Sequence, residues 1–205
     1  MPSLKRVLFS VTHLASGSLP LLGLLNLNPR VQFVPTNPVI HDYTDLQALT
    51  GLPHKMNSVA AMFAFEINFN YQFGSKQSIP HAHHLFVVRP PDPTLNLLVA
   101  SGLYSLDDAA GYYCFRLRRI CEIAKRVRQG MLLTYDDIQR GEYVGKLKSF
   151  LGLKDDPRHV PEAFDYLKPS VINEFDSKTL DWCRDCYERH LFFLKSLPLE
   201  CVSRG

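Results

Sequence analysis

Several features are missing from the sequence, and each absence excludes a class of protein. No apolar run reaches the roughly 18 residues that a membrane-spanning helix needs. No block of lysine and arginine stands out in 205 residues with a net charge of +3, so we expect no nucleic-acid partner. Internal repeats and low-complexity segments are also missing. The sequence has 46% hydrophobic and 21% charged residues. This composition is typical of a soluble globular protein.

The number of cysteines is small and odd. Five cysteines do not suit a framework of disulfides and favour a reducing compartment. Cys183-x-x-Cys186, with His190 behind it, has the spacing of half a zinc site, but no second pair stands at ligand spacing. We therefore expect two thiols packed on one face of a helix.

The N-terminus has some features of a secretory signal peptide. Lys5 and Arg6 precede the apolar stretch VLFSV, and small residues follow. However, the polar pair Thr12-His13 cuts the apolar region short, and a strand that enters a loop explains the same residues. We expect a cytoplasmic protein.

Strands alternate with helices along the chain. We expect strands over 6–12, 31–35, 84–90 and 130–137, and helices over 19–27, 44–52, 54–71, 94–101, 107–128, 142–153 and 178–196. This order predicts an α/β fold with a parallel sheet that helices cover on both faces, in one domain over residues 1–205. Ligands of such sheets bind beyond the carboxyl ends of the strands.

The stretch VLFSVTHLASGSLPLLGLL has the pattern of a strand, a turn of small residues and a helix. Free backbone N–H groups and the positive end of the helix dipole can hold a phosphate at such a turn without any side chain. The same pattern also occurs where serine and glycine serve only to turn the chain. This stretch alone leaves both interpretations open.

Three further stretches favour the phosphate-binding interpretation of this turn. They are FVVRPPDPTLNLLV at 86–99, LLTYDDI at 132–138 and KLKSFLGL at 146–153. In this order and spacing, the chain resembles the sulfotransferase family over residues 6–35 and 84–153. The resemblance implies a three-layer P-loop-like fold, with a central parallel sheet of about four to five strands flanked by helices. It also implies that the donor is 3′-phosphoadenosine-5′-phosphosulfate (PAPS), with the bisphosphate PAP as the product and no metal.

The resemblance also implies a set of nucleotide-binding residues. Ser16, Gly17 and Ser18 would hold the 5′-phosphate, with Ser18 at the position of the family's threonine. Arg89 would pair with the 3′-phosphate, because its planar fork suits a phosphate group. Asn96 lies beside the position of the serine that helps to hold the 3′-phosphate.

The chain departs from the family's pattern at two of these positions. Ala15 stands where the family has the basic residue that stabilises charge on the transferring sulfonyl group and the leaving phosphate. Leu97 stands in place of the family's serine, with only Asn96 or Thr94 near it. An active enzyme and a protein that only binds the nucleotide therefore both remain open.

Sulfonyl transfer needs a general base for the acceptor. In the family this base is a Glu or His between the first loop and the arginine strand. We name two candidates here, Glu66 and His41, and Asp42 next to His41 is an alternative on the same edge of the sheet. Glu66 lies in the apolar run AMFAFEINF, which we expect to be helical, where a carboxylate needs a partner or has a raised pKa. The polar face of a helix would explain Glu66 equally well.

The cluster HAHH, with His81, His83 and His84, is a poor candidate for a metal or catalytic site. Imidazoles this close together often bind metal. These three lead into the strand over 84–90, which places them at its amino end. We therefore expect them on the edge of the sheet opposite the phosphate loop.

The leading hypothesis is a sulfotransferase-like protein that binds PAPS or PAP and transfers a sulfonyl group to an unknown hydroxyl acceptor, a small molecule or a glycan. The alternative is a non-catalytic interaction protein that keeps the fold without binding nucleotide. A phosphotransferase of the P-loop type is a third hypothesis, but the motif G-x-x-x-x-G-K-[ST] is missing.

Overall fold

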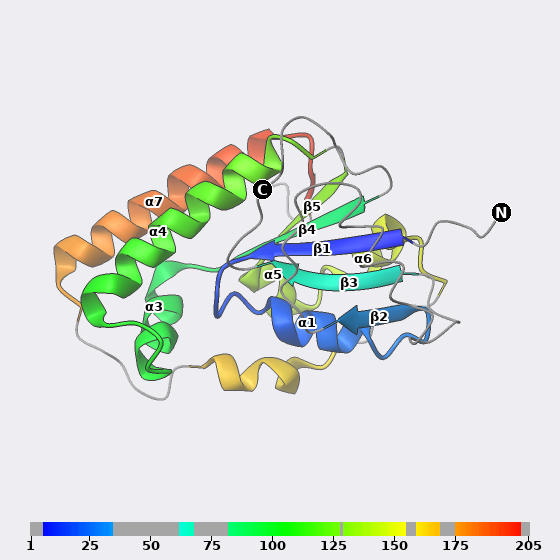
Figure 1. Cartoon of the computed structure of the whole chain (residues 1–205), viewed down its shortest axis with the longest axis horizontal. Helices are drawn as coiled ribbons and strands as arrows, with labels where there is room; N and C mark the ends of the chain where they lie inside the picture. Colours follow the sequence, from blue (N-terminus) through cyan, green and yellow to red (C-terminus); the bar gives the residue numbers. More distant parts are fainter. Residues whose placement is uncertain are drawn as a thin grey trace.

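The chain forms a parallel sheet of six strands. The computed structural model describes residues 6–34, 62–67, 82–127, 129–154, 159–168 and 175–201. The strand order is β2-β3-β1-β4-β5-β6 (Figure 1). The strands are β1 (Arg6–Thr12), β2 (Val31–Val34), β3 (Met62–Ile67), β4 (Ala82–Val88), β5 (Gly130–Thr134) and β6 (Glu200–Cys201). Every recorded pairing is parallel, which confirms the predicted fold class; β6 has only two residues.

Helices cover both faces of this sheet. They are α1 (Ser18–Leu25), α3 (Pro91–Ala100), α4 (Leu106–Ala124), α5 (Tyr135–Arg140), α6 (Val144–Leu151), the 3₁₀ helix η2 (Pro161–Leu167) and α7 (Ser177–Ser196). Helices α4 and α7 lie side by side (Figure 1). Within the described part of the chain, no helix is both long and apolar enough to cross a bilayer.

The buried side chains form one hydrophobic layer on each face. In β1, Phe9 and Val11 pack with α3, α4 and α7, whereas Leu8 packs with α1, α5, α6 and η2. Successive strand residues point to opposite faces, so both must be apolar when both faces are covered. This explains why the strands read as near-continuous apolar runs, and it confirms the three-layer arrangement.

Residues 62–67 form a strand, where we expected a helix. β3 pairs with β2 on one side and with β1 on the other. A short, continuous apolar run such as MFAFEI fits a buried strand and a buried helix equally well by periodicity. Its place inside a parallel sheet decides in favour of the strand. The remaining parts of the helices expected over 44–52 and 54–71 lie outside the described residues.

The strand expected over 130–137 ends earlier than predicted, at Thr134. The Thr134 hydroxyl accepts a hydrogen bond from the Asp137 backbone N–H, and the Asp137 carboxylate accepts one from the Thr134 N–H at 2.8 Å. This reciprocal pair is a capping box. The capping box begins α5 at Tyr135. The tyrosine and both aspartates of TYDD therefore belong to the helix and not to the strand.

His83 and His84 lie near the amino end of β4, on the edge opposite the loop after β1, as predicted; His81 lies outside the described residues. The His84 ring is buried between those of Phe9 and Phe86, at centroid distances of 5.5 and 6.4 Å. Burial lowers the pKa of His84 to about 4. Among the residues that the structure describes, no group of three or more potential ligands is arranged to hold a metal ion.

Candidate functional site

The candidate site lies where the carboxyl ends of β1 and β4 meet. Thr12, the last residue of β1, is in register with Val87 of β4. The loop over 13–17 therefore leaves the sheet beside Arg89, which directly follows β4. This juxtaposition is the one that the sequence predicted, and it is the position at which open α/β sheets bind their ligands.

The loop reaches helix α1 through two residues with left-handed backbone conformation. Ala15 has φ 59°, and Gly17, the N-cap of α1, has φ 97°. Left-handed residues between ordinary ones bend successive N–H groups toward a common point, which is how backbone nests bind anions. Pro20 occupies the first turn of α1, where its missing N–H breaks no hydrogen bond of the helix.

The serine hydroxyls of the loop lie close together. Ser16 Oγ is 3.3 Å from both the Ser18 hydroxyl and the Ser18 backbone N–H. It also forms a short hydrogen bond with the Thr12 hydroxyl. Ser16 and Ser18 are only 0% and 2% exposed. The two serine hydroxyls are therefore buried in this structure, whereas Leu14 and Ala15 of the loop are half-buried.

Two apolar groups cover the loop at Gly17. A Cβ built at this glycine would lie 3.1 Å from Tyr135 Cδ2 and 3.5 Å from Leu167 Cδ1. The chain therefore passes close beneath the first residue of α5 and the last residue of η2. A side chain at position 17 would therefore meet Tyr135 and Leu167.

Arg89, which the resemblance assigned to the 3′-phosphate, holds the loop itself in this structure. Its Nη1 donates to the carbonyl of Ala15 at 3.1 Å, and its Nη2 donates to the carbonyl of Leu167 at 2.9 Å. The guanidinium also lies over the Tyr135 ring, 4.1 Å from its centroid. With 2% exposure, Arg89 joins the loop, α5 and η2 from within the core.

His13 links the two strand ends through its imidazole. Its Nε2 accepts from the Arg89 backbone N–H at 3.1 Å, and its Nδ1 lies 2.8 Å from the Leu14 carbonyl. A carbonyl only accepts and an N–H only donates, so the ring is neutral with its proton on Nδ1. Burial, helped by the charges of Arg116 and Arg89, lowers the pKa of His13 to about 4.

Helix α4 supplies three anchors that sequence reasoning missed. All three bind backbone groups of the site: Tyr112 Oη accepts from Leu14 N–H at 3.0 Å, Tyr113 Oη donates to Arg89 O at 2.6 Å, and Arg116 Nη2 donates to Thr12 O at 2.6 Å. The sequence does place tyrosines and an arginine within YYCFR. No local sequence pattern indicates that this stretch packs against the loop over 13–17.

The two polar residues proposed beside the 3′-phosphate bond to their own helix. Asn96 Nδ2 donates to the carbonyl of Asp92 at 2.8 Å, and Thr94 Oγ1 donates to that of Pro90 at 2.7 Å. Both side chains are buried in α3.

The structure gives a position for one of the two proposed bases. Glu66 is the fifth residue of β3, opposite Ser10 of β1, and therefore near the carboxyl edge of the sheet. Its backbone belongs to a strand, so the helical setting that we expected for it is wrong. His41 and Asp42 lie outside the described residues.

Comparison with known proteins gives a structural match only. No protein-family model matches the sequence, and no curated protein matches it significantly. The sulfotransferase domain of the Synechococcus PCC 7002 olefin synthase matches with a TM-score of 0.57 at 13% identity, over 91% of this chain and 97% of that chain. Mouse sulfotransferase SULT7A1, complexed with PAP, matches with a TM-score of 0.56 at 14% identity, over 91% of this chain and 85% of that chain. The chain has the sulfotransferase fold.

The sulfotransferase fold confirms the resemblance seen in the sequence. Both comparisons cover 91% of the chain. At 13–14% identity, the match concerns the architecture of the chain. The bound PAP is a feature of the mouse sulfotransferase structure.

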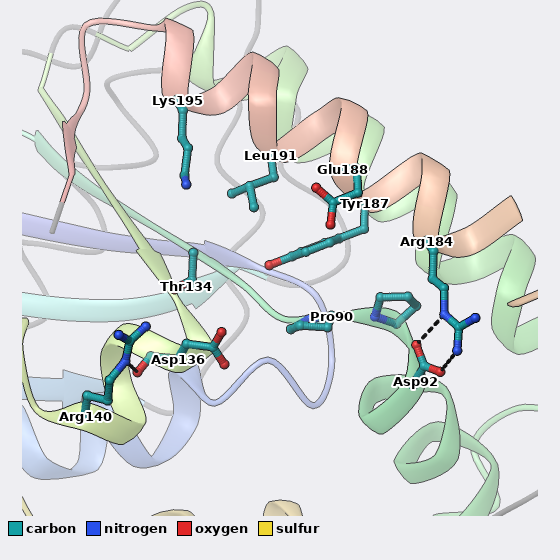
Figure 2. Close-up of a pocket in the computed structure, with 11 residues that line it drawn as sticks. Pro90, Asp92, Thr134, Asp136, Arg140, Arg184, Tyr187, Glu188, Leu191 and Lys195 are labelled. Atoms are coloured by element: carbon teal, nitrogen blue, oxygen red, sulfur yellow. Dashed lines mark hydrogen bonds and ion pairs between the residues drawn. The ribbon is translucent and has the colours of Figure 1, made fainter. Parts of the chain in front are cut away.

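A pocket of about 370 Å³ lies at the same edge of the sulfotransferase fold, between α3, α5 and α7 (Figure 2). The Tyr187 hydroxyl points into it from α7 (Figure 2). Its charged lining residues are Asp92, Asp136, Glu188, Arg140, Arg184 and Lys195. Arg184 binds both carboxylate oxygens of Asp92, at 3.2 and 2.5 Å. Acidic and basic groups balance, so the charge of the lining favours neither an anion nor a cation.

The buried histidines His13 and His84 predict a loss of stability in mild acid. Each has a pKa of about 4 in the fold against 6.5 when unfolded. The unfolded chain therefore binds more protons between these pH values, and the free energy of unfolding falls as the pH is lowered from 6.5 toward 4. Each histidine contributes up to about 3 kcal/mol to this loss. Urea unfolding measured at several pH values checks this expectation.

The matched variant for this experiment is His84→Gln, which cannot titrate and lies far from the loop. It should flatten the pH dependence by about half, and the remainder should come from His13. A wild-type protein whose unfolding free energy stays constant from pH 6.5 to 4 would contradict both assignments.

Substitutions at the two left-handed residues should have opposite effects on stability. Ala15→Gly removes a Cβ from a backbone with φ 59°, so we expect a gain of about 0.5–1 kcal/mol. Gly17→Ala adds a Cβ at φ 97°, 3.1 Å from the Tyr135 ring, so we expect a loss of about 1–3 kcal/mol. Denaturant midpoints measure both. A loss in Ala15→Gly would show that the loop is not held in this conformation.

Proposed function

We propose that the chain is a sulfotransferase-like protein that binds PAPS or PAP through the loop after β1. The observation that carries the proposal is the conformation of this loop. Gly17 caps α1 in a left-handed conformation, and Ser16 and Ser18 flank it at the positive end of the helix. Backbone N–H groups in this arrangement bind a phosphate without a lysine.

Arg89 has an indirect part in this proposal. Its guanidinium holds the carbonyl of Ala15 and so keeps the next three residues in place. A positive charge directly behind the loop also favours a negative ligand in front of it. Asn96 stays as the proposed contact on the 3′ side, on a helix that begins two residues after Arg89.

We infer that the side chains that lie against the loop at Gly17, those of Tyr135 and Leu167, adjust when the nucleotide binds. Leu167 is the side chain best placed to yield, because it ends a short 3₁₀ helix, whereas Tyr135 starts a capped α-helix. Moving Leu167 costs part of its burial, about 1.5–3 kcal/mol for a whole side chain. We expect the affinity for PAP to be reduced by this amount.

Transfer of the sulfonyl group to a hydroxyl acceptor is the finer part of the proposal. A base, Glu66 or His41, would take the proton of the hydroxyl as its oxygen attacks sulfur, and the phosphate oxygen of the donor would leave with the electron pair. Ala15 offers no charge to that leaving oxygen, a contribution commonly worth a few kcal/mol. We therefore expect weak transfer or none.

The second candidate is a non-catalytic interaction protein with the same fold. It is favoured by the buried serine hydroxyls of the loop, by Ala15, and by an Arg89 that already binds two carbonyls. Under either function we propose a single domain over residues 1–205 and a cytoplasmic location. The free state of all five cysteines supports this location.

The first test is thermal unfolding with added nucleotide. PAP should raise the melting temperature, and at a concentration one hundred times its Kd it should add about 2.7 kcal/mol of stability. ATP with magnesium should have no effect, because the loop lacks the lysine of a triphosphate site.

Calorimetry of Arg89→Ala should show lost binding of PAP. The exposed Arg30, which precedes β2 at the opposite edge, is the matched control as Arg30→Ala. An unchanged melting temperature in millimolar PAP favours the interaction protein.

The second test restores the missing cation. Ala15→Lys should raise the turnover of PAPS, measured as hydrolysis to PAP, by more than it raises affinity, because the new charge acts on the leaving oxygen. The control Ala15→Met adds length without charge and should leave turnover at the wild-type rate. Brisk wild-type turnover that Ala15→Lys does not change would mean that another cation has this role.

A further inference from the structure

Helix α7 buries one of its faces in the fold. The buried residues of this face are Cys183, Cys186, Tyr187 and Leu194. Both cysteines are free thiols in the hydrophobic layer that α7 shares with α4, which confirms the predicted face of two thiols on a helix. Trp182, the chain's one tryptophan, directly precedes Cys183 and is 49% exposed. Tyr187 differs from its buried neighbours because its polar end reaches the pocket between α3, α5 and α7 (Figure 2).

The Tyr187 hydroxyl has no protein partner, although the residue is only 7% exposed. It points into the pocket (Figure 2), and it forms no hydrogen bond with any residue that the structure describes. Buried tyrosine hydroxyls usually have a partner, as those of Tyr112 and Tyr113 do. A polar ligand in the pocket would supply the partner that this hydroxyl lacks.

The charges that line the pocket balance in number, but they differ in whether they have a partner. Two of the three basic residues already form ion pairs with acidic residues. These pairs are Arg184 with Asp92 and Asp181, and Arg140 with Glu142. In contrast, the carboxylates of Asp136 and Glu188 form no ion pair or hydrogen bond within the described part of the chain. The charges still open to a ligand are therefore mainly negative.

The two unpaired carboxylates act on the Tyr187 hydroxyl from two helices. Asp136 lies in the first turn of α5, and Glu188 directly follows Tyr187 on α7 (Figure 2). Burial raises the pKa of Tyr187, and the negative charges of Asp136 and Glu188 raise this pKa further. Both carboxylates are therefore within electrostatic reach of a hydroxyl that keeps its proton. The remaining cation, Lys195, lies seven residues beyond Glu188 and past Leu191 (Figure 2), about 10 Å along the helix.

We propose that this pocket binds an organic ammonium group, held between the carboxylates of Asp136 and Glu188 and the hydroxyl of Tyr187. An alkylammonium group has three N–H donors and no acceptor. The three side chains together offer oxygen acceptors to all three donors. A charged donor also forms a stronger hydrogen bond to a carboxylate than a neutral donor does.

The rest of the pocket suits the hydrocarbon part of such a ligand. Pro90, Pro91 and Leu191 supply apolar surface beside the charged residues. The volume of about 370 Å³ is in the range of small-molecule sites and exceeds what a single ion needs. A metal ion is a poorer fit, because no group of three or more potential ligands is arranged for one among the described residues.

The ammonium site is distinct from the loop after β1. Its lining residues come from α3, α5, α7 and the carboxyl ends of β4 and β5. Arg89 and Tyr135 directly precede Pro90 and Asp136 of the lining, but their side chains contact the loop. The inference therefore does not rest on the proposed function.

The site is tested on the full chain by calorimetry with hexylamine, which is protonated at neutral pH. We expect saturable binding of one hexylamine, with a Kd on the order of a millimolar. Hexan-1-ol has the same chain without the charge, and it should bind on the order of tenfold more weakly. Hexanoate, which has the opposite charge, should not bind.

Substitutions in the site should weaken hexylamine binding without unfolding the protein. Asp136→Asn and Glu188→Gln should each raise the Kd about two- to fivefold, because both carboxylates are exposed. Tyr187→Phe should also raise the Kd several-fold and leave the melting temperature unchanged, because the hydroxyl has no partner in the fold. The matched control is Asp185→Asn, an exposed acidic residue of α7 that pairs with Arg189, and it should bind like the wild type.

Three results would overturn the ammonium site. Equal affinities for hexan-1-ol and hexylamine would show that only the apolar surface binds. Tight binding of hexanoate that Lys195→Gln removes would show an anion site. Displacement of hexylamine by low millimolar Mg²⁺ or Ca²⁺ would show a metal site. A protein that binds hexylamine and not PAP keeps the ammonium site, whereas the proposed function fails.

Discussion

A single buried guanidinium holds the carboxyl edge of this molecule together. Arg89 joins the loop after β1 to η2 through two carbonyls and stacks on the first residue of α5. Its own backbone is held by His13 and Tyr113. Each charge-assisted hydrogen bond is worth roughly 1.5–3 kcal/mol, so this one residue offsets the unfavourable backbone conformation at Ala15 and the confinement of the chain at Gly17. Its loss would leave the contacts of Tyr135 and Leu167 at Gly17 to join the loop to α5 and η2.

The contacts that fix the loop also orient it. A loop held at its carbonyl side keeps its N–H side oriented, and an oriented N–H side is what an anion needs. In this structure the side chains of Tyr135 and Leu167 also lie against the loop at Gly17. The chain therefore combines a preorganised backbone with side chains packed against it. Whether it acts as a nucleotide binder or as an interaction protein depends on the free energy of adjusting these side chains.

The sequence predicted the loop correctly because every relevant signal was local. Strand, small residues, Pro20 and helix follow one another within one stretch, and the parallel order of strands places its end beside Arg89. The strand β3 was mistaken for a helix because a run buried on both faces has no alternation to reveal it. The anchors from α4 were missed because Tyr112 and Arg116 reach partners 98 and 104 residues away. Pairings across that distance are set by packing and not by local pattern. For Arg89, the sequence located the residue, and the structure shows which carbonyls it binds.

The position of Trp182 gives the protein a built-in optical reporter. The indole is half exposed on α7, one residue before the buried Cys183. Tryptophan emission depends on hydration, so its colour and intensity follow the surroundings of α7 without any label. Since the chain has no second tryptophan, the signal comes from this helix alone. The state of α7 is therefore readable in dilute solution, in real time, from unmodified protein.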